Sequence, residues 1–342
     1  MTVAGERICI VVAAHNAGRT IGRAIASALA EPEVAEVVVV DDASPDDTAA
    51  MARAADDGTG RLCVIRLDRN GGPAAARNAA IARSRAPLIG ILDADDFLMP
   101  GRFAALLAAG DWDLIADNVM FVAEGTPAAN PPDPVPRFMT EPAYLRLPAF
   151  IDGNISRAHA NRAELGFLKP VVRRAFLDRH GLRYDEALRL GEDYELYVRA
   201  LARGARFQVI KSCGYGAVVR PDSLSGRHST ADLARLADAD LRLLQSEALD
   251  TFSRRALERH ERQVRNNFRF RRFLDLKEEQ GAAAALRYWL TSPANALPIG
   301  RSLARARLRR LTRGIAGAAH QASPAAPRFL MPGRLAEGEG QG

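Results

Sequence analysis

Three carboxylates within four residues, Asp93, Asp95 and Asp96, follow the apolar run at 87–92 (PLIGIL). Negative charges this close repel one another and raise one another's pKa, so packing alone does not favour them. A divalent cation resolves the conflict, because Mg²⁺ and Mn²⁺ prefer oxygen ligands and Mg²⁺ commonly combines one or two carboxylates with substrate phosphates and water. The spacing therefore predicts a Mn²⁺ or Mg²⁺ site that binds a phosphorylated substrate. The alternative is a solvated acidic turn in which Asp96 caps the helix after Pro100.

Polar residues also follow the first two apolar runs, at 13–16 (AAHN) and at 41–44 (DDAS). The carboxyl ends of parallel strands meet at one edge of a sheet, where ligands of α/β proteins bind. A carboxylate such as Asp42 can accept the imide N–H of a uracil ring there, and the small Ala13 lets a base lie against the strand. The alternative is that Asp42 caps a helix that begins near Pro45.

A third acidic cluster, with Glu192 and Asp193, opens an amphipathic helix at 192–201. Transfer of a group to a hydroxyl needs one carboxylate to remove the proton of that hydroxyl as its oxygen attacks. Asp193 is the candidate for this general base and Glu192 is the next. Because a helix dipole favours carboxylates near its N-terminus, helix capping is the competing interpretation.

The segment 220–228 (RPDSLSGRH) combines two arginines, two serine hydroxyls and an imidazole, which is chemistry that suits phosphate binding. Its glycine and serines also suggest a mobile loop. Arg220 and Ser225 are predicted substrate contacts, and His228 is a candidate contact to the metal or the phosphate. A single histidine is more often structural or simply exposed, so that interpretation of His228 stays open.

The elements that position these residues follow from an alternation, up to about residue 122, of short β-branched runs and Ala-rich helical runs. This pattern predicts the α/β class with a mostly parallel, doubly wound sheet covered by helices on both faces. The expected strands are 7–13, 36–40, 61–67, 87–92 and 113–122, and the expected helices are 19–30, 46–56, 73–84 and 100–109. Further strands are expected near 205–211 and 214–220.

The chain divides into three parts by composition. Residues 1–229 form the α/β domain, interrupted by a proline-rich surface loop at 126–137. Residues 230–317 form a basic C-terminal helical extension. Residues 318–342, rich in Ala, Pro and Gly, are predicted to form a disordered tail.

The composition, the first apolar stretch and the cysteines lead us to expect a cytoplasmic protein. With 48% hydrophobic residues the chain can bury a large core, but no stretch approaches the ~20 apolar residues of a membrane span. The first apolar stretch follows Glu6 and Arg7 and ends at His15, which is typical of a strand and not of a signal peptide. The three cysteines form no CxxC pair, which favours reduced thiols over disulfides or a zinc site.

Positive charge gathers near the C-terminus, where residues 301–313 hold six arginines and no acidic residue. Apolar residues recur at helical spacing in the same segment. A basic amphipathic helix is typical of attachment to an anionic membrane surface, and a solvated charged face is the alternative. Nucleic-acid binding is not expected, because no stacking aromatic residues or nucleic-acid motif accompany the arginines.

Five segments, in this order, resemble the bacterial glycosyltransferase family 2 enzymes: VVAAHNAGRT, EVVVVDDASPDDT, NGGPAAARNAAI, LIGILDADDFLMPGR and LGEDYELYVRAL. More narrowly, the chain resembles the glucosyltransferases of succinoglycan-type exopolysaccharide assembly over about residues 6–230. The resemblance implies the GT-A fold of nucleotide-diphospho-sugar transferases.

The resemblance also assigns roles to the residues above. Ala13, His15 and Asp42 would hold the nucleobase, with Asn16 beside them; the family often has an aromatic residue in place of His15. Asp93 would meet the ribose, Asp95 would ligate the metal that bridges the diphosphate, and Asp193 would be the base. Gly72 and Arg77 belong to a turn and helix that border the donor in the family, although Gly-Gly-Pro is also an ordinary loop-to-helix junction. The loop at 220–228 would close over the diphosphate.

The function expected from these features is inverting, metal-dependent transfer of a hexose, glucose from UDP-glucose by resemblance, to a lipid-linked oligosaccharide. Such an acceptor predicts a peripheral enzyme on the inner face of the cytoplasmic membrane. Two alternatives remain. A sugar nucleotidyltransferase would need a Gly-rich, basic loop after the first strand, which AAHNAGRT lacks. An inactive membrane-associated scaffold would not need Asp95 and Asp193.

Overall fold

The computed structural model describes residues 7–124, 143–155, 164–219, 229–315 and 328–331. The strands are β1 (Ile8–Ala14), β2 (Val34–Asp41), β3 (Leu62–Arg66), β4 (Leu88–Ile91), β5 (Phe97–Leu98), β6 (Leu114–Ala123), β7 (Ala143–Tyr144), β8 (Val171–Arg173), β9 (Phe207–Val219) and β10 (Arg328–Phe329). The helices are α1 (Ile21–Leu29), α2 (Thr48–Ala54), α3 (Pro73–Arg83), α4 (Arg102–Leu107), α5 (Leu147–Asn154), α6 (Arg174–Arg179), α7 (Glu192–Ala202), α8 (Thr230–Ser246), α9 (Thr251–Gln280), α10 (Ala282–Leu290) and α11 (Pro293–Ile315), with a short 3₁₀ turn at Leu165–Phe167.

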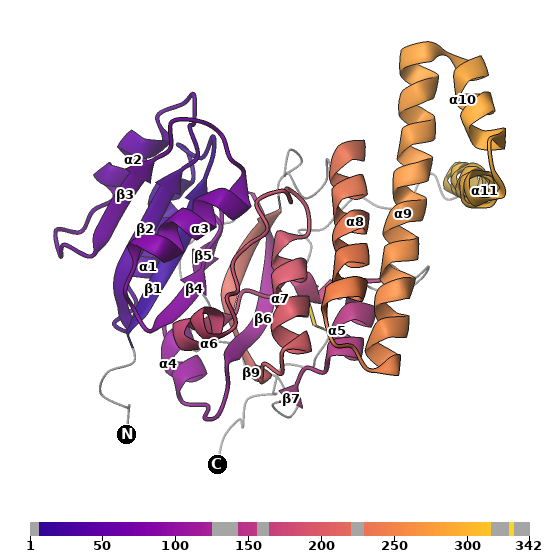
Figure 1. Ribbon diagram of the computed structural model, residues 1–342. Coiled ribbons are helices and arrows are strands. Elements are labelled where there is room, and N and C mark those ends of the chain that lie inside the picture. Colours follow the sequence, from indigo (N-terminus) through magenta and orange to yellow (C-terminus); the bar gives the residue numbers. More distant parts are fainter. Residues whose placement is uncertain (1–6, 125–142, 156–163, 220–228, 316–327, 332–342) are drawn as a thin grey trace.

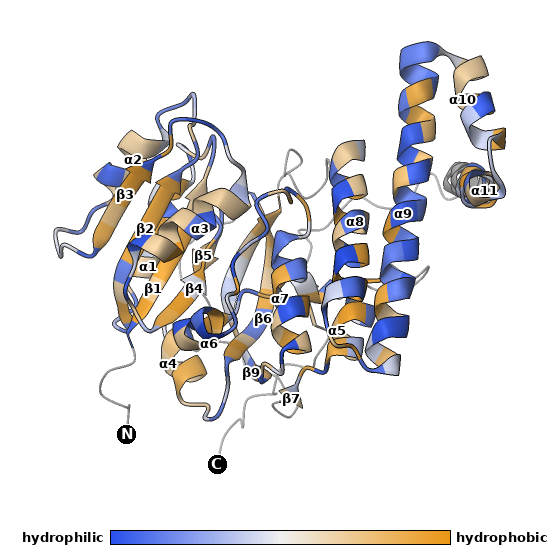
Figure 2. Ribbon diagram, in the orientation of Figure 1, coloured by the Kyte–Doolittle hydropathy of each residue, from blue (hydrophilic) through white to orange (hydrophobic). Residues whose placement is uncertain are grey.

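One sheet runs through the molecule in the order β3-β2-β1-β4-β8-β6-β9-β5 (Figure 1). Strands β1 to β4 pair in parallel, because each connection carries a helix back across the sheet. Figure 2 shows hydrophobic residues along β1, β2 and β4, and the side chains of β1 are almost wholly buried. This confirms the predicted α/β class and the predicted strands of the first half.

The second half of the sheet is mixed, which the sequence pattern did not indicate. Strand β8 is antiparallel to both β4 and β6, and β5 is antiparallel to β9. Only three residues long, β8 is too short to show a period in the sequence. The two strands expected near 205–211 and 214–220 are one strand, β9, whose pairing with β6 shifts register around Asn118.

The expected disordered tail at 318–342 is wrong for residues 328–331. Strand β10 pairs with Met120 and Phe121 of β6, and Asn118 exchanges two hydrogen bonds of 2.8 and 2.9 Å with the backbone of Met331. Leu330 is buried. Because β8 covers only the start of β6, β10 continues the coverage of the same strand edge.

The helical extension is joined to the sheet domain through α8 and the first half of α9. Figure 1 shows α8 and α9 side by side next to α5 and α7, and these helices are in contact. The buried side chain of His260 on α9 pairs with Asp240 on α8 at 2.7 Å and stacks on Tyr194 of α7. Beyond this region, α10 and α11 pack on the far end of α9 around Phe273, Leu276 and Ile299.

Candidate active site

The strand order brings the predicted clusters together at one edge of the sheet. In the β1–β2 pair, Ala14 lies opposite Asp41, and the N–H of Asp42 donates to the carbonyl of Ala14 at 2.8 Å. Strand β4 lies on the other side of β1 and ends just before the Asp93 cluster. The residues after β1, β2 and β4 are therefore neighbours, as predicted.

Asp42 orders the turn that begins α3. Its side chain is buried, and its two oxygens accept the N–H groups of Gly71 at 2.7 Å and Gly72 at 2.8 Å. Gly72 has φ of 87°, a conformation that a side chain would strain. Because α2 begins at Thr48, the alternative that Asp42 caps a helix near Pro45 is wrong. Each carboxylate oxygen has two lone pairs, so the imide of a base can still be accepted.

His15 and Asn16 lie exposed beside Asp42, and Ala13 is half-buried in β1. The His15 Nδ1 is 2.9 Å from the carbonyl oxygen of Asp42 and 3.2 Å from the side-chain nitrogen of Asn70. Asn16 has φ of 54° and donates its N–H to the hydroxyl of Ser44 at 3.1 Å. These contacts fix the two loops against each other and leave an exposed polar rim at the predicted nucleobase position.

Asp93 is held by two cations, one on each oxygen. The Arg77 Nη2 donates to Oδ1 at 2.9 Å, and the Lys169 Nζ lies 2.8 Å from Oδ2. Burial alone would raise the pKa of Asp93, but the charges of Lys169 and Arg77 outweigh burial and lower it below its ordinary value. The predicted ribose contact is therefore a firmly ionised carboxylate with a fixed orientation.

Asp193 is joined to the same cations. Its Oδ2 lies 2.9 Å from Lys169, and its Oδ1 lies 3.1 Å from the Tyr184 hydroxyl and 3.4 Å from Arg77. Glu192, beside it, accepts from Arg77 at 2.7 Å. Helix α7 is preceded by Gly191, which has no side chain to cap it, and Glu192 and Asp193 lie in its first turn, where the helix dipole favours them as well. The structure thus brings Arg77, Asp93, Glu192 and Asp193 into one cluster.

Asp96 has a different role from its neighbours. It accepts the Tyr215 hydroxyl at 2.8 Å and the Val218 N–H at 2.8 Å. Burial, followed by the charges of Asp93 and Asp95, raises the pKa of Asp96 to about 8. The alternative that Asp96 caps the helix after Pro100 is wrong, because Glu31 accepts the N–H groups of Gly101 and Phe103 there.

Asp95 is half-buried, and its backbone carbonyl accepts from Arg23 at 3.1 Å. Within the residues that the structure describes, no three His, Cys, Asp or Glu side chains gather into a metal cage. A single carboxylate at a strand end nevertheless fits Mn²⁺ or Mg²⁺, because these ions complete their shell with substrate phosphates and water. The predicted contacts Arg220, Ser225 and His228 lie outside the described residues.

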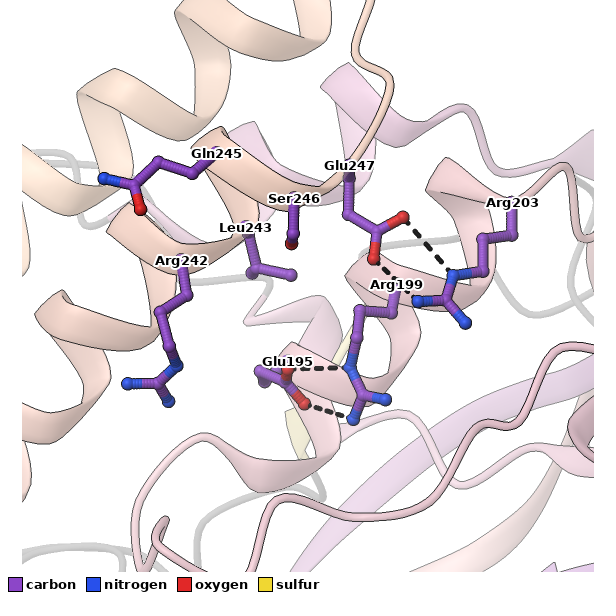
Figure 3. A pocket seen from close by; sticks show the side chains of 8 residues that line it. All are labelled: Glu195, Arg199, Arg203, Arg242, Leu243, Gln245, Ser246 and Glu247. Atoms are coloured by element: carbon purple, nitrogen blue, oxygen red, sulfur yellow. Dashed lines mark hydrogen bonds and ion pairs between the residues drawn. The ribbon is translucent and has the colours of Figure 1, made fainter.

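A separate pocket of about 420 Å³ lies between α7 and the end of α8 (Figure 3). Its arginines are paired, Arg199 with Glu195 at 2.6 Å and Arg203 with Glu247 at 2.9 Å. Residues two apart on a helix point about 200° apart, so Glu195 faces this pocket while Asp193 faces the cluster of Asp93. None of the predicted site residues lines the pocket.

Sequence reasoning missed Lys169, Tyr184 and Asn70. A signal for Lys169 was present: it is one of only three lysines among 47 basic residues, and it stands in an apolar segment, LGFLKPVV. Tyr184 and Asn70 stand in ordinary polar surroundings in the sequence, and nothing there marks them. Lys169 and Asn70 contact site residues 24 and 28 positions away along the chain, and Tyr184 contacts Asp193, nine positions away.

Comparison with known proteins identifies relatives of this chain. Residues 9–160 match the model of glycosyl transferase family 2. The chain is 58% identical to the succinoglycan biosynthesis protein ExoU of Rhizobium meliloti (strain 1021), over 85% of this chain and 84% of that one. It is 36% identical to ExoO of the same organism, over 94% and 91%. S. aureus TarS 1–349 in complex with UDP-GlcNAc shares the fold, with a TM-score of 0.57 and 18% identity over 83% of this chain and 79% of that one.

Proposed function

Since the chain belongs to glycosyl transferase family 2 and has the GT-A fold, we propose that it is an inverting hexosyltransferase of exopolysaccharide assembly. The observation that carries the proposal is the pairing of Asp193 with Asp93 through Arg77 and Lys169. This pairing sets a candidate base beside a candidate donor contact. The similarity to two succinoglycan biosynthesis proteins supports a sugar acceptor of that class.

The proposed reaction is a single displacement. The acceptor hydroxyl oxygen attacks the anomeric carbon, the bond from that carbon to the diphosphate oxygen breaks, and UDP leaves with the electron pair. Asp193 takes the proton of the acceptor hydroxyl. Asp95 would hold a divalent cation, which would supply positive charge against the negative charge that develops on the diphosphate. One displacement inverts the anomeric centre.

The proposed donor is UDP-glucose, and the proposed acceptor is a lipid-linked oligosaccharide. TarS, which shares the fold, has been solved with UDP and with UDP-GlcNAc, which supports a uridine nucleotide. The test is release of free nucleotide from a set of nucleotide sugars by the full chain. We expect release from UDP-glucose with Mn²⁺, and loss of release with a chelator or after Asp95→Asn. Failure with every nucleotide sugar would overturn the proposal and favour an inactive scaffold.

We also propose attachment of the cytoplasmic enzyme to the inner face of the membrane through α10 and α11. Leu286, Leu290 and Leu297 are 50–66% exposed on these two helices. Exposed Arg287, Arg301 and Arg307 accompany them, and no acidic residue occurs from 280 to 336. Apolar side chains beside uncompensated arginines suit the headgroup region of an anionic bilayer. Among the described residues, no helix is long and apolar enough to cross a membrane.

Changing Arg287, Arg301 and Arg307 together to glutamine should weaken binding to phosphatidylglycerol vesicles by roughly 10²-fold, at about 1 kcal/mol per charge. Changing the three leucines to serine should instead reduce the binding that persists at high salt, because burial of apolar surface is not screened. Vesicle flotation at low and high salt measures both. Phosphatidylcholine vesicles are the control. Equal flotation of wild type and both variants would rule out this surface.

A further inference from the structure

Lys169 is a buried ammonium that no sequence motif of the site includes. Its side chain is 6% exposed, and Nζ contacts both Asp93 and Asp193, at 2.8 and 2.9 Å. These contacts raise the pKa of Lys169 above its ordinary value, because the two carboxylates outweigh the opposing effect of burial. Lys169 is therefore a fixed positive charge between the two carboxylates of the proposed reaction.

The backbone around Lys169 is fixed before any substrate binds. Its carbonyl accepts from the buried Arg102 at 2.6 Å, and Arg102 is itself paired with the buried Asp117 at 2.9 Å. Pro170 follows and restricts the conformation of the residue before it. These contacts fix the backbone of Lys169, so its ammonium is less mobile than that of a surface lysine.

With Lys169 the cluster carries one excess negative charge, and without Lys169 it would carry two. Three carboxylates, those of Asp93, Glu192 and Asp193, face the two cations Arg77 and Lys169. Arg77 contacts all three carboxylates, whereas Lys169 contacts the two with proposed roles in the reaction. Without Lys169, one guanidinium would face three carboxylates in a largely buried place. Repulsion among the carboxylates would then displace Asp193 from this position.

We propose that Lys169 is a positioning residue of the transfer reaction, which holds the Asp193 carboxylate in a fixed orientation and ties it to the donor contact Asp93. The inference rests on the proposed function, because it concerns the base of that reaction. Lys169 acts on Asp193 and not on the sugar. Removal of Lys169 should therefore lower turnover more than it weakens donor binding.

The test is Lys169→Ala in the full chain, with Lys277→Ala as the matched control. Lys277 is exposed on α9 and lies outside the cluster. We expect kcat of Lys169→Ala to fall by roughly 10- to 100-fold, a part of the 10²–10⁴-fold that a positioned base provides. The KM for the nucleotide sugar should change much less, since Arg77 still holds Asp93. Lys277→Ala should match wild type.

Chemical rescue separates a positioned ammonium from a merely structural lysine. Ethylammonium added to Lys169→Ala at constant ionic strength should restore turnover. It supplies both the positive charge and the N–H donors in the space left by the Lys169 side chain. Tetramethylammonium carries the charge but no N–H donor and should not restore turnover. Melting curves check that the variant is folded. Lys169→Met, which keeps an apolar stem, is the second variant if the alanine variant does not fold, and its kcat should fall likewise.

The outcomes separate this inference from the proposed function. A folded Lys169→Ala with near wild-type kcat, or with a loss of kcat that neither ammonium changes, would overturn the role of Lys169 while leaving the transferase assignment intact. Absence of nucleotide release by wild type from every nucleotide sugar would overturn the proposed function itself. Loss of kcat that ethylammonium alone restores would support the inference.

Discussion

Asp193→Asn should lower kcat by roughly 10²–10⁴-fold, the contribution of a positioned general base. Asparagine keeps the shape of the side chain but cannot take the proton of the acceptor hydroxyl. Affinity for UDP should stay nearly unchanged, because Asp93 keeps both of its cations, Arg77 and Lys169. Steady-state transfer to a soluble acceptor analogue gives kcat, and calorimetry with UDP gives the affinity.

Glu195→Gln is the matched control for this substitution. Glu195 lies in the same first turn of α7 and is equally buried, but it pairs with Arg199 on the other side of the helix. If loss of negative charge near the helix N-terminus were the cause, both variants would lose the same activity. If only Asp193→Asn loses activity, the loss comes from the proposed proton transfer to Asp193. A folded Asp193→Asn that transfers at the wild-type rate would move the base to Glu192.

The edge of the sheet was predictable because each strand and helix is indicated by residues that are close together in the sequence. Near-continuous apolar strands that alternate with helices require a parallel sheet, and the residues after each strand then lie at one edge. This placed Ala13, Asp42 and Asp93 as neighbours, and the structure confirms it. The side chains that accept backbone N–H groups at the starts of helices were harder to predict. The carboxylates that hold the chain at the starts of α3 and α4, Asp42 and Glu31, come from distant parts of the chain.

The ion-pair cluster could not be predicted from spacing. Arg77 and Glu192 are 115 residues apart, and Lys169 and Asp193 are 24 residues apart, one just before β8 and the other on α7. Strand β8, which sets the place of Lys169, has three residues and no period of its own. A buried lysine in an apolar segment was the available signal, because such a charge needs a partner.

The C-terminal strand changes how membrane attachment should be tested. Deleting residues 301–342 would remove not only the basic C-terminal part of α11 but also β10 and the buried Leu330. The exposed edge of β6 and the lost apolar burial would then affect the catalytic domain. A loss of vesicle binding in such a deletion would therefore not identify α11. Substitutions of exposed arginines and leucines keep β10 in place.

Arg77→Met should destabilise the folded protein by about 3–5 kcal/mol at neutral pH, the usual cost of removing one partner from a buried charge cluster. Arg77 is buried, and its contacts with Asp93, Glu192 and Asp193 would all be lost. Methionine retains the apolar stem, so the loss is mainly electrostatic. Thermal melting measures the change, with Arg242→Met as the control. Arg242 pairs with Asp185 but is 54% exposed, so its loss should cost less than about 1 kcal/mol.

The pH dependence of the Arg77→Met effect identifies its cause. In the wild type, the lowered pKa of Asp93 stabilises the fold above the unfolded value of about 4, and that contribution is lost as pH falls further. In the variant, Asp93 loses Arg77, one of the two charges that lower its pKa, so this contribution to stability becomes smaller. The difference between wild type and variant should therefore shrink as pH falls below about 4. A difference that stays constant below about pH 4 would instead indicate lost packing, with the charge on Asp93 contributing little.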